Sequence, residues 1–158
     1  MIIATGTVTV NPAFLQEIKD DAREFRQLLA QASEMLGPAN LGAADPRQIV
    51  DLLCRLRDQL ALHFTLEEAY GYFEDAINAA PRLSEQAELL RNQHQPLFAD
   101  FCRLVESAEK LLYDGADDDA RATIARMYHN FRADIQLHEA REHDLILAAF
   151  NDDIGAGD

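Results

Sequence analysis

The sequence predicts an all-α protein: an up-down-up-down antiparallel four-helix bundle with a short extended N-terminal arm. Three observations predict this fold class. Apolar residues recur at steps of three and four along four long segments, which is the spacing of one helix face. Segments rich in Gly, Pro and Asp separate them, as expected between helices. After the first ten residues, no stretch alternates polar and apolar residues as a half-buried strand would.

The first two helices have clear start signals. Asn11 and Asp45 are suitable N-cap residues, and each precedes a proline that fits the first helical position. We expect the first helix to end before Gly37 and the second near Ala80, because glycine and proline follow at both places.

The third helix is expected from about Ser84 to Gly115. Pro96 lies inside it, and a proline in a helix interior removes a backbone hydrogen bond and bends the helix. The fourth helix opens on the acidic run 117–119, which favours the positive end of the helix dipole. The predicted organisation is an arm at 1–11, one four-helix domain at 12–150 and a polar tail at 151–158.

Charge and cysteine content limit the partners and the compartment. The 158 residues carry 14 basic and 28 acidic side chains, a net charge of -14, which repels phosphate backbones and anionic lipid. We therefore expect neither nucleic acid nor a membrane as a partner. No secretory signal and no spanning segment is recognisable. Cys54 and Cys102 are far apart and mid-helix, which favours free thiols in a reducing cytoplasm.

Two His–Glu pairs carry the chemistry of the chain. His63 and Glu67 are four residues apart, as are His138 and Glu142, so each pair shares one helix face. His94 lies on the apolar face of the helix between them. Such groups are costly to bury unless they are paired or bind a metal. Imidazole and carboxylate ligands suit iron, manganese or zinc better than calcium or magnesium. We predict that these five residues are metal ligands.

The motifs resemble those of the hemerythrin-like (HHE cation-binding) family over roughly residues 14–150. The resemblance rests on three segments: HFTLEE from His63 to Glu68, RNQHQPL around His94, and the pair His138 and Glu142. The resemblance implies a non-haem iron site of one or two ions, with terminal His ligands and carboxylates able to bridge. It also implies a protein that binds or senses oxygen, nitric oxide or peroxide, or holds iron.

Two positions depart from the family pattern. Ala22 and Phe98 stand where the family usually has His ligands. Asp21 and Glu24 flank Ala22, but the periodicity places both off the inward face; His143 or a water is another candidate substitute. Two weakly bound metals, one metal or none all stay open, and the ion could be zinc or manganese.

Other readings use the same fold. One is a metal-free or weakly metallated interaction module in which the five residues form a buried polar network. Another is a di-iron peroxidase or oxidase, although no acid–base pair outside the metal ligands is evident, so binding is favoured over turnover. A histidine phosphotransfer bundle fits poorly because His94 lies on an apolar face. His129 is expected at the surface, and His143 either at the surface or behind the ligands; the oligomeric state is left open.

Overall fold

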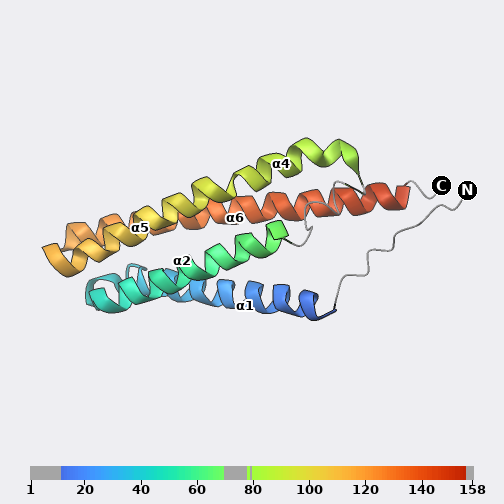
Figure 1. Cartoon of the computed structure of the whole chain (residues 1–158). Helices are drawn as coiled ribbons and strands as arrows, with labels where there is room; N and C mark the ends of the chain where they lie inside the picture. Colours follow the sequence, from blue (N-terminus) through green and yellow to red (C-terminus); the bar gives the residue numbers. More distant parts are fainter. Residues whose placement is uncertain (1–11, 70–77, 79, 156–158) are drawn as a thin grey trace, which may run out of the picture.

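The computed structural model describes residues 12–69, 78 and 80–155. This part of the chain is helical and contains no strand, which confirms the all-α class. The expected arm and the end of the second helix lie outside the described residues. The elements are α1 (Pro12–Met35), η1 (Leu41–Ala43), α2 (Pro46–Ala69), η2 (Pro81–Leu83), α4 (Ser84–Asn92), α5 (His94–Asp114) and α6 (Asp118–Gly155), as Figure 1 shows.

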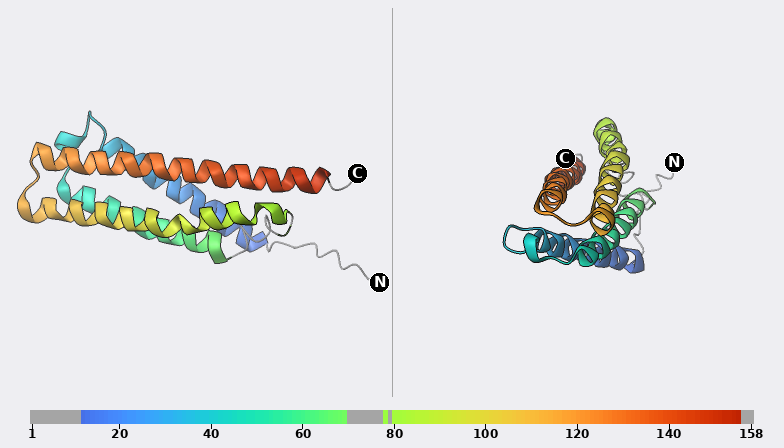
Figure 2. Two further views of the ribbon diagram at one scale, coloured as in Figure 1. Left: turned by 90° about the horizontal axis from the view of Figure 1, so that it is seen from above. Right: turned by 90° about the vertical axis from the view of Figure 1, so that its left-hand side faces the viewer.

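The helices form a four-helix bundle in which α4 and α5 together make one of the four rods. Helix α1 packs on α2, α2 on α5, and α5 on α6, while α4 also packs on α6. The loop that holds η1 and the connection from α5 to α6 lie at the same end of the bundle (Figures 1 and 2). Helix α6 continues past residue 150, into the segment that the composition assigned to a polar tail.

Local side-chain chemistry explains where the helices begin and end. The Arg47 amide donates to Oδ1 of Asp45 (3.0 Å), and the Ala120 amide donates to Oδ1 of Asp117 (2.7 Å), so both aspartates cap a helix. Helix α5 ends at Gly115, whose φ of 92° favours glycine. These are the boundaries that the sequence indicated.

The expected bend near Pro96 takes the form of a break at Gln93, between α4 and α5. Pro96 has no amide hydrogen to donate to the carbonyl of Asn92, and its ring would clash with that carbonyl in a continuous helix. The Gln93 amide instead bonds the Leu90 carbonyl at 3.1 Å. His94 is therefore the first residue of α5.

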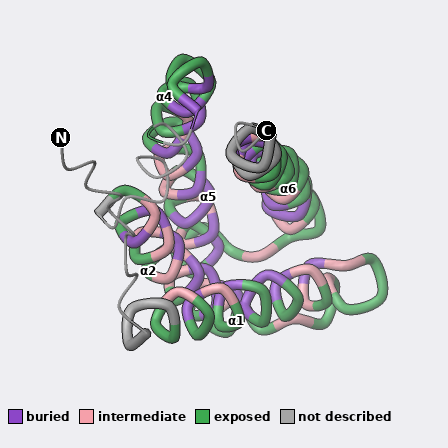
Figure 3. Tube along the Cα trace, turned by 90° about the vertical axis from the view of Figure 1, so that its right-hand side faces the viewer, coloured by how far each residue is buried: buried purple, intermediate pink, exposed green. Residues whose placement is uncertain are grey.

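The interior consists of a large apolar cluster and a smaller one. The large cluster joins the inward faces of α1, α2, α5 and α6 (Figure 3) and includes Phe25, Leu56, Leu60, Phe101, Tyr128 and Ile135. The smaller cluster joins η2 and α4 to the last part of α6 through Leu83, Ala87, Leu90, Leu145 and Ala149. The sequence positions between these two clusters carry the predicted metal ligands.

A hydrogen bond in the large cluster yields a test of the packing. Tyr128 is fully buried, and its hydroxyl donates to the Leu29 carbonyl (2.7 Å) and contacts the Ser33 hydroxyl (2.8 Å). Tyr128→Phe removes these bonds inside the core, so we expect urea unfolding to show a loss of about 1–2 kcal/mol. Tyr113→Phe is the matched control, because Tyr113 is 84% exposed and should give no measurable loss. Equal stability of the two variants would contradict the described packing.

Candidate metal centre

Polar groups interrupt the core at one level of the bundle. Among the described residues, the buried polar or charged side chains are Asp21, His94, His138 and Glu142, each exposed by 6% or less. They come from α1, α5 and α6; His94, His138 and Glu142 face one another, and Asp21 contacts His63 beside them. Burial of such groups together requires that they compensate one another or bind an ion.

Four of the five predicted ligands meet within a small volume. Glu67, His94, His138 and Glu142 each offer one ligand atom, and these atoms all lie within 4.8 Å of one another. Bonds of about 2.0–2.2 Å put ligands on opposite sides of a metal ion about 4–4.4 Å apart. A small inward movement of the side chains would therefore enclose one ion.

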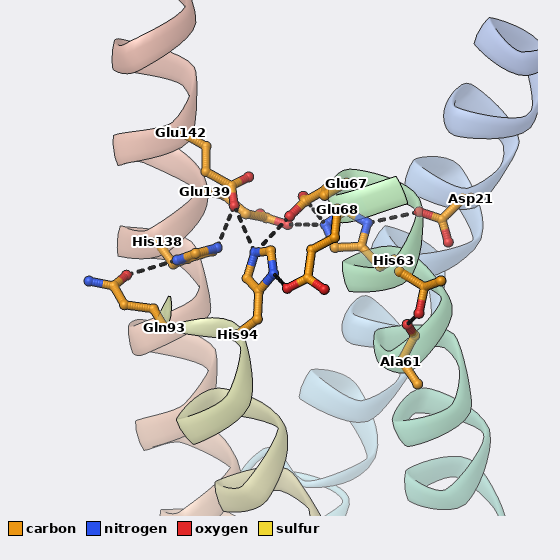
Figure 4. Close-up of polar contacts among 11 residues, drawn as sticks. Asp21, Ala61, His63, Glu67, Glu68, Gln93, His94, His138, Glu139 and Glu142 are labelled. Atoms are coloured by element: carbon orange, nitrogen blue, oxygen red, sulfur yellow. Dashed lines mark hydrogen bonds and ion pairs between the residues drawn. The ribbon is translucent and has the colours of Figure 1, made fainter. Parts of the chain in front are cut away.

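The carboxylates connect all five residues into one series. Glu67 approaches two imidazoles: its Oε1 lies 2.9 Å from Nε2 of His63, and its Oε2 lies 3.0 Å from Nε2 of His94. Glu142 likewise contacts two, because its Oε1 lies 3.4 Å from Nε2 of His94 and also pairs with Nε2 of His138. Figure 4 shows this series running from α2 to α6. His63 thus reaches the cluster through Glu67.

The other nitrogen of each imidazole is held by an acceptor. Nδ1 of His63 donates to Oδ2 of Asp21 (2.8 Å), and Nδ1 of His94 donates to Oε1 of Glu68 (3.0 Å). Nδ1 of His138 donates to Oε1 of Gln93 (2.8 Å), as Figure 4 shows. All three rings consequently turn Nε2 toward the carboxylates, which is how metal-binding histidines are oriented by their neighbours.

Aromatic rings fix two of these imidazoles from the side. Phe64 stacks on His94 with ring centroids 4.1 Å apart and an interplanar angle of 10°. Phe25 stacks on His63 at 4.8 Å and 16°. Because the two phenylalanines are themselves buried, they restrict ring rotation and exclude water from one side of each imidazole.

The expectation that Asp21 lies off the inward face of the first helix is wrong. Its side chain is buried, with Oδ1 accepting from Nε2 of Gln59 (2.6 Å) and Oδ2 accepting from His63. A usable signal was present, because Asp21 stands four residues before Phe25 and thus shares its face. Ala22, by contrast, is only half-buried.

Three further polar contacts could not be assigned because the sequence gives no register between helices, although Glu68 was expected either in solvent or behind a ligand. Glu68 and Gln93 hold His94 and His138, and Glu139 extends from α6 to within 3.7 Å of His63. Burial raises the pKa of Glu139; His63 opposes this effect, and the carboxylates of Glu142 and Glu67 add to it. His129 is exposed, as the sequence predicted. His143 is exposed as well, which selects the surface position from the two that were left open for it.

Contacts within the cluster strongly shift the pKa values of its own side chains. Burial lowers the pKa of His63, but the bond to Asp21 and the contact with Glu67 outweigh burial and raise that pKa to about 10. Burial is likewise outweighed at His94, where Glu142 and Glu67 raise the pKa to about 9. At Glu67 burial acts upward, but His63 and His94 lower the pKa to about 2. Imidazolium–carboxylate pairs therefore hold the metal-free cluster together at neutral pH.

The donor set fits a transition metal. Three buried atoms, Nε2 of His63, Oε2 of Glu67 and Nε2 of His138, make no hydrogen bond of acceptable geometry although charged groups lie near. All three point into the cluster, which leaves them suited to an ion at its centre. Imidazole nitrogens and carboxylate oxygens are the ligands that iron, manganese and zinc accept.

Comparison with known proteins identifies the family. The model of the hemerythrin HHE cation-binding domain matches residues 13–150, so the chain belongs to the hemerythrin HHE cation-binding family. No curated protein and no solved structure matches the chain significantly. Within the described residues, no helix has the length and apolar character needed to cross a membrane.

The pKa values predict how the stability of the metal-free protein depends on pH. His63 and His94 have raised pKa values, so their contribution is complete below about 6.5 and is lost as the pH rises through about 9 to 10. Glu67 has a lowered pKa, so its contribution is complete above about 4.5 and is lost toward about 2.

Chelator-treated protein should therefore have its highest melting temperature between about pH 4.5 and 6.5, and the melting temperature should fall on both sides. The His63→Ala variant provides the comparison, since it should lose much of the alkaline decline. A melting temperature that rises from pH 7 to 10 would contradict the described pairing of His63 with Asp21 and Glu67.

Proposed function

We propose that the protein binds non-haem iron through His63, Glu67, His94, His138 and Glu142. The observation that carries the proposal is the convergence of three imidazole Nε2 atoms on two carboxylates, with every Nδ1 held by an acceptor. His63, His94 and His138 would be terminal ligands. Glu67 and Glu142 each contact two imidazoles, so both would be able to bridge if two ions bind. Zinc and manganese are accepted by the same donors.

We further propose a small ligand, namely oxygen, nitric oxide or peroxide, for the iron-loaded protein. A hollow of about 230 Å³ lies between α5 and α6, with His138 and Gln93 in its wall beside Pro96 and Leu97. It is large enough to admit a diatomic molecule or peroxide beside His138. The free thiols of Cys54 and Cys102 fit a reducing compartment such as the cytoplasm.

A metal-free interaction module is the second candidate. It is favoured by one observation, which is that the raised pKa values let protonated His63 and His94 pair with the carboxylates without an ion. A peroxidase or oxidase would use the same iron, and it predicts substrate-dependent consumption of peroxide or oxygen.

Metal analysis separates these candidates. Untagged protein, purified without chelator and then supplied anaerobically with ferrous iron, should retain iron after desalting and show an absorption spectrum that changes with oxygen or nitric oxide. A protein that retains no iron, manganese or zinc would favour the metal-free interaction module over the iron-binding function. Iron with steady peroxide consumption would favour the enzyme.

Single substitutions on α6 test the ligand assignment. His138→Ala should lower bound iron strongly, because it removes a buried donor at the centre of the cluster. His143→Ala on the same helix is the control and should leave bound iron unchanged, because His143 is exposed. Equal iron in both variants, measured by mass spectrometry of the metal content, would place the site elsewhere.

The hydrogen bond from Nδ1 of His138 to Gln93 should also affect metal affinity. Gln93→Met keeps the length of the side chain and removes the acceptor of His138 Nδ1. Loss of such a partner typically weakens metal binding by about 10–100-fold. Gln95→Met, at an exposed position in the same segment, should not change the affinity in competition with a chelator. Equal affinities would show that Gln93 does not orient the ring.

A further inference from the structure

Glu139 is a charged residue beside the cluster that belongs to neither of the two His–Glu pairs. It follows His138 on α6, and its side chain is 36% exposed. Its Oε1 lies 3.7 Å from Nε2 of His63, which belongs to helix α2. In Figure 4 the carboxylate points from α6 toward Glu67 and His63.

The two oxygens of Glu67 divide the cluster into two parts. Oε2 faces His94, on the side where His138 and Glu142 complete a group of four ligand atoms. Oε1 faces Nε2 of His63, which does not belong to that group. His63 therefore has a buried ring nitrogen without a well-directed hydrogen bond, and the groups in front of it are Glu67 and Glu139.

We propose that Glu139 is a metal ligand that completes a second ion position with His63 and Glu67. The first position has Glu67, His94, His138 and Glu142, and Glu67 bridges the two. This inference rests on the proposed iron-binding function and adds the residue that makes the site a two-metal site. The family usually has a histidine ligand on the first helix, where this chain has Ala22. Glu139 on α6 would replace that ligand.

The distances support this assignment. Two ligands on one ion with bonds of about 2.0–2.2 Å lie about 3–3.5 Å apart, close to the 3.7 Å between His63 and Glu139. Carboxylate-bridged metal pairs are about 3.5–4 Å apart, which matches a glutamate with one oxygen toward each ion. Three carboxylates, Glu67, Glu139 and Glu142, also gather in one region, and a second cation relieves their mutual repulsion.

Asp21 is the other acidic residue near His63, and its contacts exclude it from this role. Both of its oxygens are engaged, one with Gln59 and the other with Nδ1 of His63. It therefore lies behind the imidazole, on the opposite side from Nε2. Asp21 orients His63, whereas Glu139 stands in front of it.

The two positions differ in how much protein surrounds the ion. The first would have four protein donors from α2, α5 and α6, and the second would have three. Fewer donors leave more coordination sites for solvent or an added ligand.

The test is an anaerobic titration of the chelator-treated protein with Co²⁺, with bound metal measured by equilibrium dialysis. Wild-type protein should bind about two equivalents, and Glu139→Gln should bind about one. Asp144→Asn, at an exposed position on the same helix, should keep both ions. The double variant His63→Ala, Glu139→Gln should also keep about one, because both donors would serve the same ion.

Each outcome is decisive. Two ions in Glu139→Gln would overturn the assignment, and so would a single ion in the wild-type protein. No ion in the wild-type protein would instead refute the proposed function itself. Thermal unfolding of each metal-free variant checks that it is folded. In crystals grown with Co²⁺, the anomalous peak beside His63 should be absent from Glu139→Gln, and the peak beside His138 should remain.

Discussion

Mutual compensation of buried charge is the constraint on which the centre of this bundle depends. Glu67 and Glu142 each contact two imidazoles, so the carboxylates and rings form an alternating series across the interior. Removal of one member leaves its neighbour buried and unpaired, which generally destabilises a protein more than the intact pair stabilises it. The apolar clusters on both sides can pack closely only because this series satisfies its own charges or holds a cation.

The helix break at Gln93 serves the same centre. Because α5 begins at His94, the break brings Gln93 against His138 while His94 faces Glu67 and Glu142. Pro96 fixes the place of the break, since its ring would clash with the Asn92 carbonyl of a regular helix and its nitrogen cannot donate to that carbonyl. One proline thus determines the orientation of two imidazoles from different helices.

The sequence predicted the four-helix class, the helix caps and the convergence of the two His–Glu pairs with His94, because each depends on spacing within one helix. It did not predict the role of Asp21. Phe25 lies both on the apolar face that the periodicity indicated and on the adjacent face that it shares with Asp21, and carboxylates are normally exposed. Glu139 and Gln93 were missed for another reason. Their partners lie on other helices, and the offset between helices depends on side-chain packing that no periodicity reveals. Whether the five residues bind metal stays a prediction.

The separation of the core into two clusters affects the dynamics of the site. Helix α4 rests on the smaller cluster, with Leu90 against the part of α6 that carries Leu145 and Ala149. Opening this segment disrupts far fewer apolar contacts than unfolding the bundle, so its free energy of opening should be the lower one. Amides of α4 would then exchange with solvent faster than those around Leu56 and Phe101. Transient opening at this end would let an ion enter or leave while the larger cluster stays folded.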